Sequence, residues 1–182
     1  MSAGEPLRFT VTVSEADFLA GVRLMMRDFA RRFVPAALAV GVGLFLLVQY
    51  LKFGDALATR HNMLVVVAGV AIFLAIPLAG MALFYFFALP PMARRQFAAQ
   101  PYAAVPTTYE MDDAGMRTAN AHGTDDLPWS MIGGASADRH VVLVRRGPTE
   151  AFTIPRAHLS AEDDAALTGL LRRHVVWKGS QP

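Results

Sequence analysis

Two long runs of apolar residues dominate the pattern of the chain. The first extends over residues 33–51, with Gln49 and Tyr50 as its polar interruptions, and the second extends from Met63 to Met92 without a charged residue. A helix that crosses a bilayer needs about 20 apolar residues. Both runs meet this length, so the pattern predicts two transmembrane helices, at residues 33–51 and 64–89, that form a hairpin within residues 33–92.

Prolines and small residues mark the two predicted spans. Pro77 lies near the middle of the second span, and we expect Pro90 and Pro91 to end it, because proline has no backbone N–H to donate. Small residues spaced four apart allow two helices to approach closely. Such residues, through which we expect the spans to pack, are Ala39 and Gly43 in the first and Ala71, Ala75 and Ala79 in the second.

Residues 1–32 combine a strand pattern with a basic helix pattern. At residues 7–13, apolar residues alternate with polar ones, which is the period of a half-buried strand. From Glu15 to Arg32, apolar residues recur at helical spacing beside a stripe of arginines. This stripe fits a solvated helix face next to a membrane, and it also fits contact with anionic phospholipid headgroups.

Basic residues are distributed unevenly around the predicted hairpin. The joining segment, residues 52–62, contains Lys52 and Arg60. The segments before and after the hairpin contain Arg23, Arg27, Arg31, Arg32, Arg94 and Arg95. Cytoplasmic segments carry an excess of Lys and Arg. We therefore expect both termini in the cytoplasm and the joining segment outside, and these six arginines are the candidates for contact with the membrane surface.

After the second run, the pattern changes to short strands separated by turns. Strand-like segments occur at residues 107–111, 116–120, 125–129, 132–137, 141–145 and 150–154. A last helix is predicted at residues 161–174, with Ser160 as its N-cap. Since one strand is not stable alone, we expect strand 7–13 to join the sheet formed after the hairpin.

These elements predict an α+β membrane protein. A two-helix transmembrane hairpin is inserted into a small antiparallel β domain in the cytosol, which a C-terminal helix closes. The order of its elements is that of a pleckstrin-homology-like split barrel. The expected parts are residues 1–32 (strand and basic helix), 33–92 (hairpin) and 93–182 (β-rich domain).

Composition narrows the classes of function. The chain of 182 residues has a net charge of +2 and no cysteine. The small net charge gives no support for nucleic-acid binding. The absence of cysteine excludes disulfides, Cys-ligated zinc, iron–sulfur clusters and thiol catalysis. No Asp, Glu, Lys or Arg lies deep in either span, where ion pathways usually need one, so we do not expect a transporter that works alone.

The titratable residues form no recognisable catalytic or metal-binding motif. None of the five histidines lies three or four residues from another. The pairs Asp112-Asp113, Asp125-Asp126 and Asp163-Asp164 lie at predicted turns and a helix start, where turn chemistry explains them. Trp129 is predicted to anchor either the core or the membrane interface. We therefore predict no enzyme activity, no cofactor and no metal site.

Two short segments carry a resemblance to a known family. They are Leu127–Ile132 (LPWSMI) and Phe152–Arg156 (FTIPR), the latter followed by the helix that Ser160 caps. Together with the first strand and the two-span hairpin, they make the chain similar to the YcxB-like family of small bacterial membrane proteins. The resemblance covers most of the chain, although Arg156 stands where such sequences often carry Lys. It implies the architecture above, and the family has no established activity or site residues to transfer.

The sequence therefore favours a multi-pass protein of the bacterial cytoplasmic (inner) membrane whose cytosolic β-rich domain has an interaction or regulatory role. Its expected partners are the lipid bilayer, anionic phospholipid headgroups, and a protein partner or a second copy of the chain. Nucleic acid is not expected. The alternative function is an accessory subunit of a membrane transporter or membrane enzyme complex, with the reactive groups supplied by the partner.

Overall fold

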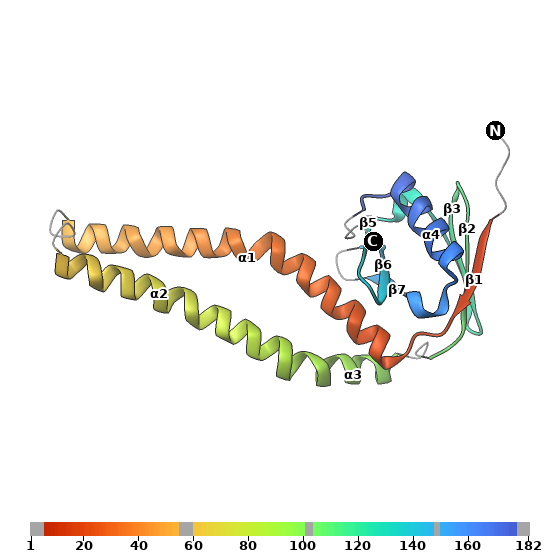
Figure 1. Ribbon diagram of the computed structural model, residues 1–182, viewed down its shortest axis with the longest axis horizontal. Helices are drawn as coiled ribbons and strands as arrows, with labels where there is room; N and C mark the ends of the chain where they lie inside the picture. Colours follow the sequence, from red (N-terminus) through yellow and green to blue (C-terminus); the bar gives the residue numbers. More distant parts are fainter. Residues whose placement is uncertain (1–5, 55–59, 101–103, 148–149, 178–182) are drawn as a thin grey trace. The chain divides into compact units, whose positions relative to one another are not determined.

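The computed structural model describes residues 6–54, 60–100, 104–147 and 150–177. The chain divides into two compact units, whose elements are labelled in Figure 1. The helical unit is Met26–Pro91, and the β domain combines Met1–Met25 with Met92–Pro182. Residues 55–59 of the predicted joining segment lie outside the described residues.

Two long helices, α1 (Glu15–Phe53) and α2 (Arg60–Leu83), contain the first apolar run and most of the second. At the start of α1, the backbone N–H of Asp17 donates to Ser14 Oγ over 3.2 Å, and the N–H of Ser14 donates to Asp17 Oδ2 over 3.0 Å. This reciprocal cap satisfies two backbone donors of the first turn. Helix α1 then continues through Pro35, and both helices are long and apolar enough to cross a membrane.

The second helix continues through Pro90-Pro91, contrary to the prediction that these prolines end it. A π-helical turn, Phe84–Ala88, follows α2 and leads into α3 (Leu89–Ala99). In this turn the N–H of Leu89 donates to the carbonyl of Phe84, one residue farther than in an α-helix. Both prolines then fall in the first turn of α3, where a missing N–H costs little. The wide turn therefore lets the helix pass two prolines.

Glycine and phenylalanine residues bring α1 and α2 together within the helical unit. A Cβ atom at Gly41 would lie 2.7 Å from the ring of Phe73, and one at Gly69 would lie 2.7 Å from the ring of Phe45. The two rings stack with centroids 6.1 Å apart. Each helix thus receives a ring from the other at a glycine. The small residues predicted to make this contact are exposed instead: Ala39, Gly43, Ala71, Ala75 and Ala79.

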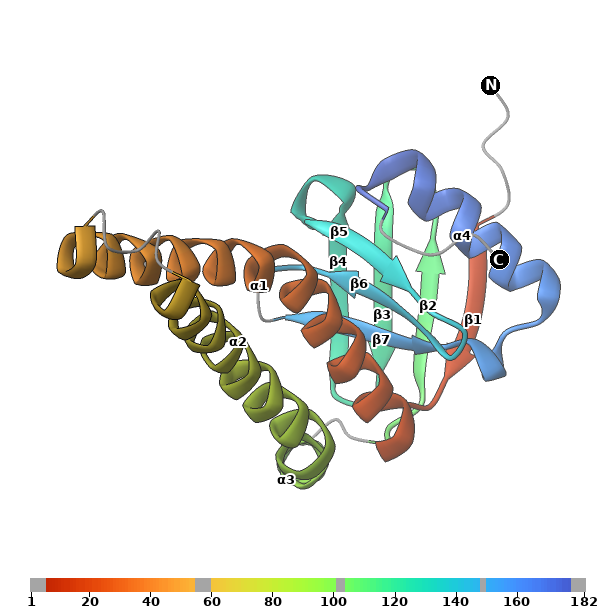
Figure 2. The same ribbon diagram turned by 60° about the vertical axis from the view of Figure 1, so that its left-hand side comes forward.

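Two antiparallel sheets form the β domain, and their strands cross in Figure 2. The first sheet has the order β1 (Leu7–Val11), β2 (Thr107–Met111), β3 (Gly115–Asn120) and β4 (Gly123–Pro128). The second has the order β5 (Gly134–Ala137), β6 (Val141–Arg145) and β7 (Ala151–Pro155). Helix α4 (Ala161–His174) follows, with the N–H of Asp163 donating to Ser160 Oγ as the predicted cap.

Strand β1 precedes both apolar runs in the sequence, yet it belongs to the sheet formed by strands that follow them. It pairs antiparallel with β2, which places Phe9 opposite Tyr109, and the two rings stack with centroids 5.5 Å apart. The alternating pattern at residues 7–13 predicted that this strand joins the sheet, and it does so beside β2. In the turn between β2 and β3, Asp112 Oδ1 accepts the N–H groups of Ala114 and Gly115.

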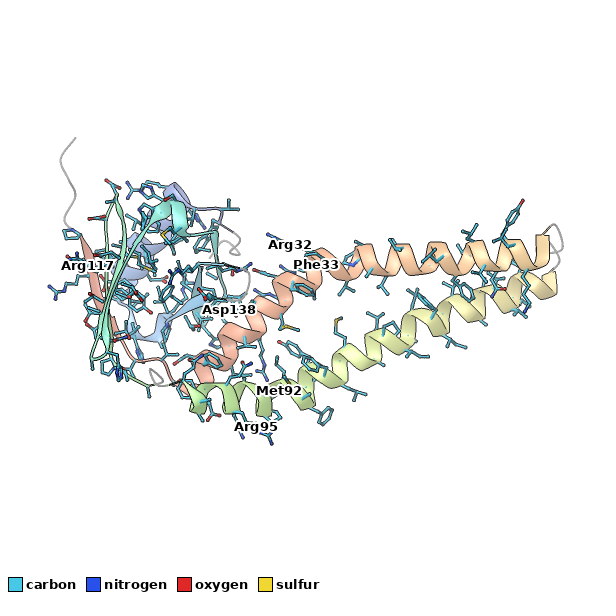
Figure 3. All side chains as sticks on the ribbon, turned by 180° about the vertical axis from the view of Figure 1, so that it is seen from behind. Arg32, Phe33, Met92, Arg95, Arg117 and Asp138 are labelled. Atoms are coloured by element: carbon cyan, nitrogen blue, oxygen red, sulfur yellow. The ribbon has the colours of Figure 1, made fainter. Side chains whose placement is uncertain are left out.

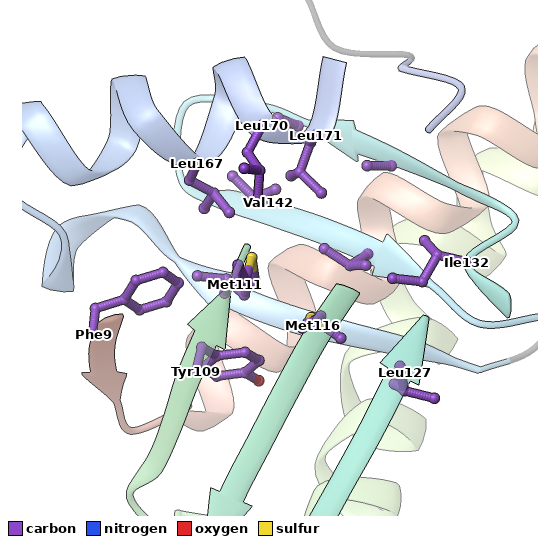
Figure 4. Packing of buried hydrophobic residues seen from close by; sticks show 14 of the residues in the cluster. Phe9, Tyr109, Met111, Met116, Leu127, Ile132, Val142, Leu167, Leu170 and Leu171 are labelled. Atoms are coloured by element: carbon purple, nitrogen blue, oxygen red, sulfur yellow. The ribbon is translucent and has the colours of Figure 1, made fainter. Parts of the chain in front are cut away.

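One hydrophobic core lies between the two sheets and α4 (Figure 4). Its buried residues include Met111, Met116, Leu127, Val142, Val144, Ile154, Leu167, Leu170 and Leu171. On the other face of the second sheet, Leu24 of α1 packs with Val141 and Leu143. Strand β6 is therefore buried on both faces, which explains its continuous β-branched run.

Candidate functional site

The predicted surface arginines lie on α1 and α3. Those exposed in the structure are Arg27, Arg31 and Arg32 of α1 and Arg94 and Arg95 of α3; Arg32 and Arg95 are labelled in Figure 3. Arg23 is half-buried in the β domain. Arg94 Nε lies 2.8 Å from Glu15 Oε1, so this arginine connects α3 to the first turn of α1. Arg27, Arg31 and Arg32 share one helix and are the stronger candidates for a surface contact.

A groove of about 730 Å³ opens at the side of the β domain where the two sheets separate. We call it the open groove, and its described lining includes Phe18, Phe97, Thr107, Tyr109, Thr118, Asn120, Asp125, Glu150, Phe152 and Thr153. Side chains two apart on a strand share a face. Along β3 the inward face therefore passes from buried Met116 to Thr118. A sheet face that begins in the apolar core thus continues as a polar floor in the groove.

Three phenylalanines from three different elements line the open groove. Phe18 comes from α1 and Phe97 from α3, and their ring centroids are 5.7 Å apart. Phe152 comes from β7. All three side chains are half-buried, so part of each ring remains accessible. Aromatic rings offer an apolar body and a negative π face to a ligand.

Tyr109 lies where the open groove meets the core, at the edge of the packed cluster in Figure 4. The residue is 3% exposed, and burial raises the pKa of its hydroxyl to about 12. Among the described residues, no hydrogen bond to this hydroxyl is formed. Since Tyr109 lines the groove, its hydroxyl is available to a molecule there, opposite the buried side chain of Thr118 in the sheet.

Two neighbouring carboxylates on β4 have different environments. Asp126 accepts hydrogen bonds from Arg117 Nε and Nη2 over 2.6 and 3.0 Å, and Arg117 points away from the domain in Figure 3. The hydrogen bond from Arg117 holds the pKa of Asp126 below its usual value. Asp125 lines the open groove and forms no ion pair with any described residue. Strand alternation thus places one carboxylate of the pair outside and the other at the groove.

Trp129 anchors the core, which resolves the two roles predicted for it. The strand predicted at residues 125–129 ends at Pro128, and Trp129 starts a short 3₁₀ turn. Its Nε1–H donates to the carbonyl of Asp112 over 3.0 Å. Its ring stacks on His174 with centroids 5.1 Å apart. The LPWSMI segment therefore fastens the β2–β3 turn to the end of α4.

Arg156 connects β7 to α4. Its Nε donates to Asp164 Oδ1 over 2.7 Å, and its Nη1 donates to the carbonyl of Asp138 over 2.9 Å. The side chains of Arg156 and Asp164 are 23% and 26% exposed. The hydrogen bond to Asp164 raises the pKa of the Arg156 guanidinium. The arginine of the FTIPR segment thus has a structural role.

Sequence reasoning did not find the open groove. The signal was present in the strand pattern, because Thr118 occupies an inward position of β3 that an ordinary core would fill with an apolar side chain. Phe18 and Phe97 could not be assigned to the groove, because they lie far apart in sequence. Within the described part of the chain, no three His, Asp or Glu side chains come together to hold a metal ion.

No family model matches the chain, and comparisons with curated proteins and with solved structures found no match. The function proposed below rests on the residues and geometry of this chain.

Proposed function

We propose that the chain is a multi-pass protein of the bacterial cytoplasmic membrane whose cytosolic β domain has a binding role rather than a catalytic one. The observation that carries this proposal is the exposure of the apolar helices. None of the most apolar 18-residue stretch of either helix is buried within the structure. A large exposed apolar surface is unfavourable in water, whereas a bilayer solvates it.

The distribution of arginines supports an orientation with both termini in the cytoplasm. Arg27, Arg31 and Arg32 are exposed just before and at the start of the first proposed span, residues 33–51. Arg94 and Arg95 follow the second, residues 64–89, whereas Lys52 and Arg60 belong to the joining segment. The excess of arginine on one side favours that side as the cytoplasmic one.

The β domain is proposed to be a pleckstrin-homology-like split barrel of the YcxB-like type. Two observations support this: the sheets have four and three antiparallel strands, and a C-terminal helix packs on their shared core. A first strand contributed from before the hairpin also fits this arrangement. In this proposal the hairpin tethers the domain to the membrane.

The orientation can be tested with single cysteines, because the chain has none of its own. Thr59→Cys lies in the joining segment, and Ser160→Cys lies at the exposed N-cap of α4. We expect an impermeant maleimide to label Thr59→Cys in spheroplasts and to label Ser160→Cys only after the membrane is broken. The reverse pattern would contradict the orientation, and release of the protein by alkaline carbonate would contradict membrane insertion.

Contact with anionic headgroups is the second part of the proposal, at about 1 kcal/mol for each basic residue near the surface. The triple variant Arg27→Gln/Arg31→Gln/Arg32→Gln should remain inserted but crosslink less to a photoactivatable phosphatidylglycerol. Arg94→Gln is the control, because Arg94 already pairs with Glu15. Equal crosslinking of the triple variant and the unaltered chain would refute the headgroup contact.

A further inference from the structure

We propose that the open groove binds an organic ammonium group. This inference gives a chemical class to the ligand of the β domain and rests on the binding role proposed above. Three features of the groove carry it: aromatic walls, an unpaired carboxylate at the rim, and the hydroxyl of a buried tyrosine at the inner end. In a chain with 17 Lys and Arg residues, none of the described residues that line this groove is a Lys or an Arg, and the basic side chain among them is His122.

The aromatic walls suit a cation whose charge is covered by carbon groups. Three elements of the chain contribute these walls, through Phe18, Phe97 and Phe152. The rings of Phe18 and Phe97 are tilted by 47° relative to each other, with their centroids 5.7 Å apart. A cation over an aromatic face is attracted by the ring quadrupole, and quaternary ammonium groups are bound in this way by aromatic cages. An anion such as phosphate would meet the same rings with the opposite sign of interaction.

The charges at the rim favour a cation as well. Asp125 lines the groove and has no ion-pair partner among the described residues. Glu150 also lines it, and its carboxylate is 4.0 Å from Arg146, a separation that leaves it open to a closer cation. An opposite charge at short range is the usual partner of an ammonium group.

The inner end of the groove can receive the polar part of the same ligand. The side chain of Tyr109 is 3% exposed and lines the groove, where its hydroxyl forms no hydrogen bond to a described residue, and Thr118, opposite it in the sheet, is 5% exposed. A hydroxyl group both donates and accepts hydrogen bonds. A hydroxyalkyl ammonium, as in choline or ethanolamine, carries both of the groups that this arrangement recognises.

Two sources can supply such a group: a free amino alcohol, and the headgroup of phosphatidylcholine or phosphatidylethanolamine. The shared chemistry is the ammonium group. The purified full-length protein in phosphatidylglycerol nanodiscs, which contain no ammonium lipid, is titrated with choline by calorimetry. A parallel titration uses nanodiscs of phosphatidylcholine. Weaker apparent choline binding in the second case identifies the lipid headgroup as a competitor, and equal binding identifies the free molecule as the ligand.

The uncharged isostere 3,3-dimethylbutan-1-ol separates the effect of charge from that of shape. We expect choline to bind and the isostere to bind at least about tenfold more weakly, because it keeps the apolar contact and loses the attraction to the rings and Asp125. Equal affinity for the two molecules, or no heat of choline binding in phosphatidylglycerol nanodiscs, overturns the inference. The cysteine-labelling result would stand in either case, so the membrane proposal fails or survives separately.

A pair of neighbouring aspartates provides matched variants. Asp125→Asn should weaken choline binding about fivefold or more, since it removes the unpaired charge at the rim. Asp126→Asn should leave the affinity within about twofold, because that carboxylate pairs with Arg117 on the outer face. Both residues are exposed, so neither change threatens folding. Phe152→Leu, checked for an unchanged melting temperature, should weaken choline more than the isostere. Equal losses for Asp125→Asn and Asp126→Asn would overturn the assigned site.

Discussion

The helical unit and the β domain use the same apolar residue types in opposite ways. In the β domain, Val144 and Leu171 are both 0% exposed. In the helical unit, Leu51 is 75% exposed and Ile76 is 68% exposed. The β domain removes its apolar side chains from water by packing two sheets and α4 together. Among the described residues of the helical unit, no comparable cluster of buried apolar side chains forms, so the exposed ones need another apolar environment.

This difference shows that apolar composition alone does not distinguish a core from a membrane surface. What distinguishes them is whether the rest of the chain covers the apolar side chains. A helix satisfies its backbone hydrogen bonds internally, so it can face lipid on all sides. Strands need neighbours, and here they obtain them from segments on both sides of the hairpin. One chain can therefore place its helices in lipid and its strands in a water-exposed domain.

The largest expected contrast comes from leucine truncations in the two regions. Leu167→Ala removes a side chain that is 0% exposed and should lower the free energy of unfolding of the β domain by about 2–5 kcal/mol. Leu47→Ala alters a side chain that is 52% exposed in the helical unit and should leave that free energy unchanged. Urea unfolding in detergent, followed by the fluorescence of Trp129 and Trp177, which both belong to the β domain, measures both. A comparable loss in the two variants would remove the distinction between the regions.

The buried side chain of Tyr109 predicts a loss of β-domain stability in alkali. Its pKa is raised from 10.0 to about 12 in the folded state, so the unfolded chain loses this proton first as the pH rises. Stability is therefore full below pH 10 and falls between about pH 10 and 12, by roughly 2–3 kcal/mol in total. Tyr109→Phe has no proton to lose and should show a smaller fall. Identical alkaline melting curves for the two proteins would refute the raised pKa of Tyr109.

Two glycines contrast a rigid neighbour with a movable one. At Gly115 of the β domain, an added Cβ would lie 2.4 Å from the carbonyl oxygen of Leu127. At Gly41 of the helical unit, it would meet the ring tip of Phe73 at 2.7 Å. We expect Gly115→Ala to lower β-domain stability by about 1–3 kcal/mol. Gly41→Ala should leave the β domain unaffected, because the contact lies in the other unit. Thermal melting of the two variants provides the comparison.

Two arginine–aspartate pairs within the β domain give the smallest expected effects. Arg156→Gln leaves Asp164 and the Asp138 carbonyl without their partner in a site about one quarter exposed, and should cost about 1–3 kcal/mol. Arg117→Gln breaks a fully exposed pair and should produce no measurable change in the melting temperature. Equal destabilisation by the two variants would mean that burial does not determine how much each pair stabilises the β domain.

Much of the fold follows from the periodicity of the sequence. The alternation at residues 7–13 was enough to predict that β1 joins the sheet, because an isolated strand has no partner for its backbone groups. The cap at Ser160 and the turn at Asp112 were also predictable, since both depend on local side-chain hydrogen bonds. Such local interactions depend on residues that are neighbours in the sequence, so these features can be predicted without knowledge of the fold.

Features that depend on distant residues were not predictable in the same way. The helix continues past Pro90-Pro91 because a π-helical turn precedes it, and residue propensities do not indicate such a turn. The helices pack through Gly41 and Gly69 because each accepts a phenylalanine ring from the other helix. The open groove combines Phe18 of α1 with Phe152 of β7, which only the folded chain brings together.

The central claim is that lipid surrounds the helical unit while water surrounds the β domain. The most direct test places a spin label at Ile76→Cys, which is 68% exposed near the middle of the second proposed span, and at Ser160→Cys as the reference. In reconstituted bilayers, we predict that the label at residue 76 is relaxed by oxygen and protected from a water-soluble nickel complex, with the reverse at residue 160. Nickel access at residue 76 equal to that at residue 160 would contradict the claim.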